Sequence, residues 1–155
     1  METHLMKTLG EIGAVAALGL SAAGSAWGIG LSGAAAIGAW KKSYAQGKNA
    51  LFTLLVFAGA PMSQTIYGMI MLIFINNAVA AHPENWAAYA GGGIFGGIGM
   101  GCSAVFQGYT GAAAADALNE TGKGFANYLM VLGVVETVSL FVLVFMQMGF
   151  VNVAN

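Results

Sequence analysis

The sequence has very little charge and no arginine. Charged side chains make up 7% of its 155 residues, and all five basic residues are lysines. About a quarter of the residues in a typical soluble domain are charged, so this chain cannot cover a surface that faces water on all sides. The net charge of −1 also excludes the basic surface by which proteins bind nucleic acid. Composition therefore predicts an integral membrane protein.

The chain also has one cysteine, Cys102, and only two prolines. A single cysteine excludes an internal disulfide and leaves the redox compartment open. Because Cys102 lies in an apolar segment, we expect it to be a small residue packed between helices. None of the 24 glycines belongs to a phosphate-binding loop, which would end in Gly-Lys-Ser or Gly-Lys-Thr. We therefore expect that the chain is not an enzyme on its own and does not hydrolyse ATP.

Apolar residues, in contrast, make up 58% of the chain. Four apolar segments each exceed the roughly 20 residues that span a bilayer. They extend over residues 12–40, 50–81, 86–115 and 125–151. Because backbone groups in lipid must find hydrogen-bond partners within their own segment, each segment is predicted to be a helix. The first segment lacks the cleavage pattern of a signal peptide, so we interpret it as a membrane span.

Three polar breaks separate these segments, at residues 41–49, 81–85 and 116–124. The first and third breaks contain four of the five lysines, which favours the cytoplasmic side of a membrane. We expect these two loops to be cytoplasmic and both termini to lie outside, in a bacterial plasma membrane. His4 and His82 fall outside the apolar segments, where we expect them to be solvated.

The two halves of the chain resemble each other. The run Gly-Ala-Ala-Ala begins at Gly33 and again at Gly111, an offset of 78 residues. The second and fourth segments align with an offset of 72, which places the neutral Gln64 on Glu136. The duplicated unit therefore carries one carboxylate rather than two.

This repeat predicts the fold. We infer a first helical hairpin in residues 1–80 and a second in residues 86–155, fused into one structural unit with the same orientation. The fold class is an all-α membrane protein with four transmembrane helices. Small residues at four-residue spacing, such as Gly93, Gly97 and Gly101, let helices approach closely in lipid. We expect the first and third helices to form a tight inner layer and the second and fourth a looser outer layer.

Glu136 lies in the middle of the fourth apolar segment. A charge at the centre of a membrane helix costs about 2.5–3.5 kcal/mol on insertion scales. Such residues are rare and generally functional. The function of Glu136 therefore depends on which polar residues can contact it within the membrane.

Neutral polar residues also lie at membrane depth in the second and third segments, namely Ser63, Gln64, Tyr67 and Gln107. Pro61 removes a helical hydrogen bond and frees a nearby backbone carbonyl, such as that of Ala60. Hard cations prefer oxygen ligands of this kind, and one carboxylate neutralises one monovalent cation such as Na⁺. A proton would neutralise Glu136 with fewer oxygens, and isolated residues of these types also simply join helices. We expect the Tyr67 hydroxyl to donate a hydrogen bond to Glu136.

Together these residues resemble the membrane rotor-ring subunit, the c- or K-type proteolipid, of V-type and A/V-type rotary ATPases. The motif Pro-Met-Ser-Gln-Thr-Ile-Tyr-Gly at residues 61–68 is similar to that of sodium-translocating members. Phe-Gln-Gly at residues 106–108 is similar to their motif in the third helix, and Val-Glu-Thr at residues 135–137 contains the single glutamate. The resemblance covers nearly the whole chain.

The resemblance implies that Glu136 is the ion-translocating carboxylate of a rotor that carries Na⁺, with no organic cofactor. The implied metal ligands are Glu136, Gln64, Gln107, Ser63 and the backbone carbonyl of Ala60. Tyr67 would bond the carboxylate without binding the ion. The implied partners are identical copies in a ring within lipid, a stator membrane subunit with an arginine, and a cytoplasmic central-stalk subunit.

Three other interpretations remain open. The same rotor would carry H⁺ if the neutral oxygens were not needed. A small channel or carrier that acts alone would conduct ions without ATPase partners, although one buried charge and no inverted repeat argue against it. A purely structural assembly protein would account for the glycines but would leave Glu136 unexplained.

Overall fold

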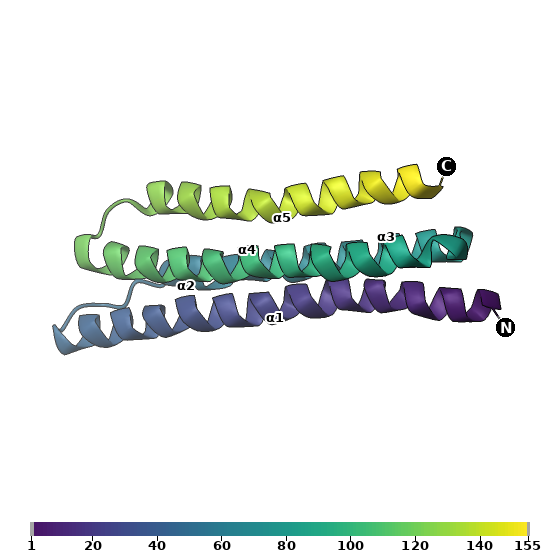
Figure 1. Cartoon of the computed structure of the whole chain (residues 1–155). Helices are drawn as coiled ribbons and strands as arrows, with labels where there is room; N and C mark the ends of the chain where they lie inside the picture. Colours follow the sequence, from purple (N-terminus) through teal and green to yellow (C-terminus); the bar gives the residue numbers. More distant parts are fainter. Residues whose placement is uncertain (1, 155) are drawn as a thin grey trace.

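The computed structural model describes the backbone of residues 2–154 and the side chains of residues 2–150, and every regular element in this part of the chain is helical. The elements are α1 (Glu2–Ala45), α2 (Leu54–Gly59), η1 (Ala60–Met62), α3 (Ser63–Ala81), η2 (Pro83–Asn85), α4 (Trp86–Thr121) and α5 (Phe125–Ala154). They form two hairpins that lie along one common axis (Figure 1). Four stretches are long and apolar enough to cross a membrane: Glu2–Ala45, Leu54–Ala81, Pro83–Thr121 and Phe125–Phe150. The all-α fold with four membrane helices is thus as predicted.

Two helices run further than their apolar segments. The sequence predicts polar breaks from residues 41 and 116, but α1 continues to Ala45 and α4 to Thr121. Polar residues mark where a helix leaves the membrane, whereas glycines mark where the chain turns. The connections contain Gly47, Gly122 and Gly124 with positive φ angles of 67°, 66° and 89°. This backbone conformation is open to glycine and unfavourable for most other residues.

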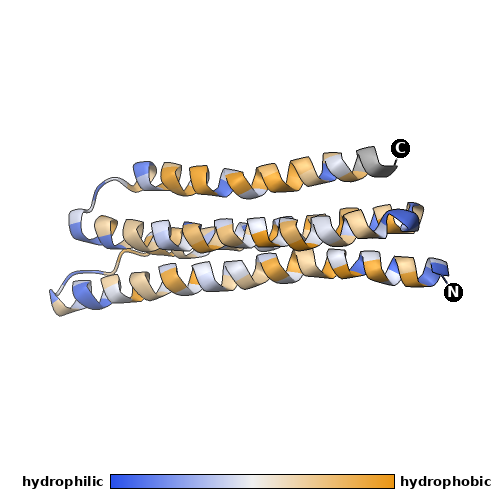
Figure 2. Ribbon diagram, viewed as in Figure 1, coloured by the Kyte–Doolittle hydropathy of each residue, from blue (hydrophilic) through white to orange (hydrophobic). Residues whose placement is uncertain are grey.

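Polar contacts join the extended ends of α1 and α4. Lys42 forms an ion pair with Glu120, and Ser43 donates a hydrogen bond to Asn119 Oδ1 over 2.8 Å. Asn119 Nδ2 in turn donates to the carbonyl of Ala39 over 3.0 Å. Hydropathy in Figure 2 changes from orange along the helices to blue near this end. These contacts explain why both helices persist beyond the apolar segments.

Helices α1 and α4 form the closest pair, as expected for the small-residue helices. A Cβ added at Gly24 would overlap the backbone of Gly101, and one added at Gly93 would overlap the backbone of Gly13. Glycine at these positions therefore lets the two backbones touch. Helix α5 is the least buried of the four membrane helices and lies along α4 (Figure 1).

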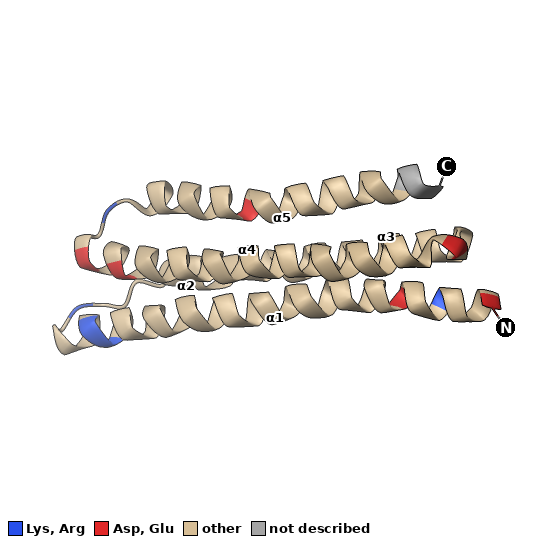
Figure 3. Ribbon diagram, in the orientation of Figure 1, with Lys and Arg blue, Asp and Glu red and all other residues tan. Residues whose placement is uncertain are grey.

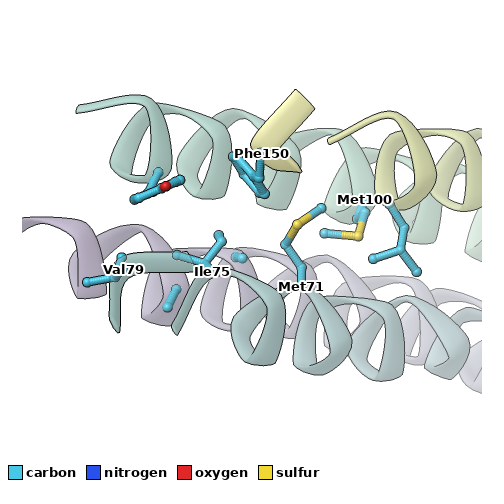
Figure 4. Close-up of a cluster of buried hydrophobic side chains, with 9 residues drawn as sticks. Met71, Ile75, Val79, Met100 and Phe150 are labelled. Atoms are coloured by element: carbon cyan, nitrogen blue, oxygen red, sulfur yellow. The ribbon is translucent and has the colours of Figure 1, made fainter. Parts of the chain in front are cut away.

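Two apolar clusters fill the interior on either side of the middle of the bundle. One contains Met71, Ile75, Val79, Met100 and Phe150, which Figure 4 shows converging from α3, α4 and α5. The other lies nearer the lysine-rich end and is formed by residues that include Ala36, Ala39, Leu54, Phe57, Ala114, Ala115, Leu118 and Leu132. Along the second, third and fourth apolar segments, Gln64, Gln107 and Glu136 lie between the positions that contribute to the two clusters.

Cys102 does not pack between helices as the sequence predicts, because its side chain is exposed on α4. The neighbouring Gly101 faces α1 instead, and adjacent helical residues point about 100° apart. The histidines lie at helix ends: His4 is exposed, and His82 lies 3.1 Å from the Glu84 carboxylate.

Candidate functional site

Glu136 is half-buried in the middle of α5. It is the acidic residue of that helix, and Figure 3 shows its red segment far from the charges that gather at the two ends of the bundle. Val134 and Val138 on the same helix are 69% and 51% exposed, so apolar side chains flank the carboxylate on the outer surface. Glu136 thus lies at the outer surface of the helix bundle.

Two side chains hold the carboxylate from neighbouring helices. The Tyr67 hydroxyl on α3, expected as a donor, lies 2.6 Å from Glu136 Oε1. Gln107 Nε2 on α4 lies 3.3 Å from Glu136 Oε2 and also donates to the Leu132 carbonyl over 3.1 Å. Hydrogen bonds to an ionised acceptor are stronger than those between neutral groups. The site therefore holds both carboxylate oxygens in place.

The hydrogen bonds continue from Gln107 into α3. Gln64 Nε2 donates to Gln107 Oε1 over 2.8 Å, and both glutamines are fully buried. The Ser63 hydroxyl lies 3.2 Å from Gln64 Oε1 and 3.2 Å from the Ala60 carbonyl oxygen. The six residues that the sequence singles out thus belong to one connected group of polar atoms. The role of five of them, all except Tyr67, as ion ligands remains a prediction.

Pro61 shapes the α3 side of this group. Helix α2 ends at Gly59, and Pro61 lies in the single 3-10 turn before α3 begins at Ser63. The backbone N–H of Ser63 also donates to the Ala60 carbonyl, so this oxygen points toward the Ser63 side chain. Pro61 is buried beside Gly28 of α1, where an added Cβ would lie 2.8 Å from the proline Cβ. The distortion is therefore held in place by packing.

The site offers more oxygens than a carboxylate alone needs. Besides Glu136 it contains two amide oxygens, a hydroxyl and a backbone carbonyl, all from uncharged groups. Gln107 Nε2 donates a hydrogen bond to Glu136, so the Oε1 atom of Gln107 faces Gln64. A monovalent cation among these oxygens would leave the whole site neutral, which makes burial beside lipid tolerable. The donor set fits Na⁺, which prefers oxygen ligands as other hard cations do.

Sequence reasoning missed two contributors to the site. Ser103 on α4 donates to the Val135 carbonyl over 2.9 Å, next to the glutamate. The Leu132 carbonyl accepts from Gln107 and so helps orient that amide. With the offset of 78 residues between the two halves, Ser103 aligns with Ser25, and this match was the available signal for the serine. Every residue has a backbone carbonyl, so the sequence does not indicate that the carbonyl of Leu132 takes part in the site.

Comparison with known proteins agrees with this architecture. Residues 12–75 and 90–148 each match the family model that describes the C subunit of ATP synthase. The chain belongs to this ATP synthase family. The two matches fall on the two hairpins, so each hairpin is one unit of the family and the chain is a duplicated member of it.

A curated relative supports the assignment. The chain is 30% identical over 136 residues to a protein named A-type ATP synthase subunit K from Methanocaldococcus jannaschii. The match covers 86% of this chain and 57% of the relative. This member of the ATP synthase family therefore spans little more than half the length of that relative.

Proposed function

We propose that the chain is the ion-carrying subunit of a membrane rotor ring and that each copy binds one Na⁺ at Glu136. The single observation that carries this proposal is the connected group of neutral oxygen-bearing residues that meets the Glu136 carboxylate. A carboxylate that only needs to be neutralised has no use for two buried amides. Family membership and the name of the archaeal relative support the rotor itself.

Ion binding would require one change in the hydrogen bonds. Gln64 now directs an N–H group at Gln107 Oε1, so a partial positive charge already lies against one oxygen of the site. Na⁺ would take the place of that N–H group, and the Gln64 amide would turn so that its own oxygen faces the ion. Tyr67 and Gln107 Nε2 would keep their bonds to Glu136, which holds the carboxylate steady during the exchange.

Rotation would follow from the position of Glu136 at the lipid boundary. With Na⁺ bound the site is neutral and passes lipid at little electrostatic cost. An arginine on a separate stator membrane subunit would compete for the carboxylate and release the ion. The connections after α1 and α4 would face the cytoplasm and a central-stalk subunit in a bacterial plasma membrane. The chain itself would be non-catalytic, since ATP chemistry would belong to other subunits.

Carbodiimide labelling of Glu136 tests the sodium assignment. The reagent reacts with the protonated carboxyl, so a cation in the site should slow the reaction. We expect Na⁺ to slow labelling of the assembled ring at a fixed pH, and K⁺ at the same ionic strength to have little effect. Glu120, which is 54% exposed at the lysine-rich end, serves as an internal reference outside the site. Equal labelling rates in Na⁺ and K⁺ would refute the sodium assignment.

The rotor carrying H⁺ is the second candidate, and one observation favours it. Gln107 Oε1 already accepts a hydrogen bond from Gln64 Nε2, and a proton on Glu136 would not compete for that oxygen. Protonation would therefore need no rotation of Gln64. In this case Gln64→Leu should leave ATP-driven pumping largely intact, whereas a sodium rotor should lose it.

A third test separates both rotors from a stand-alone channel: the purified protein in liposomes should conduct no Na⁺ without its partner subunits.

A further inference from the structure

The hydroxyl of Ser25 on α1 is buried and makes no hydrogen bond to any residue that the structure describes. The side chain is 2% exposed. Another buried serine of the same helix, Ser21, donates to the Ala17 carbonyl one turn earlier over 2.7 Å. Burying a hydroxyl without a partner is unfavourable. Ser25 therefore differs from Ser21 in having a donor and an acceptor that are still available.

Two close contacts fix how α1 lies against the chain around α3. A Cβ added at Gly68 would lie 2.8 Å from the Cβ of Ser21. A Cβ added at Gly28 would lie 2.8 Å from the Cβ of Pro61. The chain thus runs antiparallel to α1 here, and these two contacts set the register.

Ser25 and Gln64 lie between these two contacts. On α1, Ser25 is four residues from the first contact and three from the second. On the other chain segment, Gln64 is likewise four residues from the first contact and three from the second. Residues three and four apart share one face of a helix. The two buried residues therefore occupy facing positions.

The internal repeat gives the same placement independently. The hydroxyl of Ser103 on α4 donates to the Val135 carbonyl of α5. The offset of 78 places Ser103 on Ser25, and the offset of 72 places Val135 on Ser63. Ser25 thus belongs beside Ser63 and the adjacent Gln64, just as Ser103 lies beside the corresponding residues of the second hairpin.

Na⁺ binding would give the Ser25 hydroxyl a partner. When the Gln64 amide turns its oxygen toward the ion, its N–H groups leave Gln107 Oε1, their present acceptor. The Ser63 hydroxyl, which now lies 3.2 Å from Gln64 Oε1, would itself bind the ion. A buried N–H group without an acceptor is costly, and a serine oxygen has two lone pairs that can accept.

We propose that Ser25 is a positioning residue, whose hydroxyl oxygen accepts an N–H group of Gln64 in the Na⁺-bound form and thereby raises the affinity for Na⁺. This inference rests on the proposed function. It adds a residue from α1, a helix that supplies none of the other polar groups of the site. Because protonation of Glu136 needs no rotation of Gln64, Ser25 favours Na⁺ over H⁺.

Carbodiimide labelling of the assembled ring tests the role of Ser25. Ser25→Ala removes the hydroxyl and keeps the rest of the side chain. The Na⁺ concentration that halves the rate of Glu136 labelling should rise about fivefold or more, since a buried N–H group then lacks its acceptor. A midpoint within twofold of the unmodified ring would overturn the proposal.

Ser21→Ala is the matched control. It removes a buried hydroxyl from the same face of α1, but this hydroxyl already bonds the Ala17 carbonyl. Its Na⁺ midpoint should stay within twofold of the unmodified ring, and a rise equal to that of Ser25→Ala would mean that any buried serine of α1 has this effect. In K⁺, Ser25→Ala should label at the unmodified rate at each pH tested. A changed rate there would mean that the hydroxyl acts on Glu136 without Na⁺ and would overturn the proposal.

Thermal stability separates a positioning role from a structural one. In K⁺, Ser25→Ala should leave the melting temperature of the ring unchanged or raise it, because the lost hydroxyl had no partner and alanine is the better helix former. In Na⁺ the melting temperature should fall below that of the unmodified ring, because weaker ion binding stabilises less. An equal fall in both salts, or loss of the ring on a native gel, would give Ser25 a structural role and overturn the proposal.

These outcomes also separate the inference from the proposed function. If Na⁺ does not slow labelling of the unmodified ring, the sodium assignment and the role of Ser25 both fail. If Na⁺ slows labelling of the unmodified ring and of Ser25→Ala with the same midpoint, the proposed function stands and only the role of Ser25 is wrong.

Discussion

Replacing Gln107 with leucine removes the residue that joins the buried amides to the carboxylate. The side chain is fully buried and makes three hydrogen bonds, to Glu136, to the Leu132 carbonyl and from Gln64. A hydrogen bond to a charged group contributes about 1.5–3 kcal/mol. If Na⁺ loses one oxygen ligand of comparable strength, its affinity should fall roughly 10- to 150-fold, since about 1.4 kcal/mol is a factor of ten.

The assay is the Na⁺ concentration that halves the rate of carbodiimide labelling of Glu136 in the assembled ring. Gln107→Leu should raise this concentration at least tenfold. Gln147→Leu is the matched control, because it makes the same change at an exposed glutamine further along α5. A midpoint for Gln107→Leu within threefold of the unmodified ring, with the ring intact, would refute the reasoning that the amide oxygen binds the ion.

Two further predictions follow from the contacts. Tyr67→Phe removes the 2.6 Å hydrogen bond to Glu136, so the same midpoint should rise about tenfold or more while the ring remains assembled; an unchanged midpoint would exclude the hydroxyl from the site. Gly24→Val should prevent the close approach to Gly101 and lower the melting temperature of the purified protein by several degrees or abolish folding. Gly38→Val on the same helix is the control, because an added Cβ there meets no atom within 4 Å, and equal destabilisation by both changes would contradict the packing argument.

The membrane helices and the polar group of the site were within reach of the sequence. Long apolar segments are stable in lipid as helices. A glutamate within an apolar segment, with glutamines at similar depth in other segments, strongly indicates a functional site. The helix ends were harder, since Lys42 and Glu120 look like loop residues but pair across two helices. In the connections after α1 and α4, the glycines with positive φ show where the chain turns.

The order of donors and acceptors within the site was beyond the sequence. The sequence predicts that Gln64 and Gln107 supply amide oxygens to an ion at Glu136. It does not predict that Gln64 directs an N–H group at Gln107 and that Gln107 directs one at Glu136. This order depends on which backbone carbonyl lies beside each amide, and that is a property of helix packing. The exposure of Cys102 was missed for a related reason, because spacing alone does not say which neighbour occupies a helix face.

Sodium binding by the purified ring tests the central claim most directly. Equilibrium binding of radioactive Na⁺ should reach one ion per chain, and Glu136→Gln should abolish it while Glu120→Gln leaves it unchanged. A ring that binds no Na⁺ at millimolar concentration, or that binds it equally well after Glu136→Gln, would contradict the account.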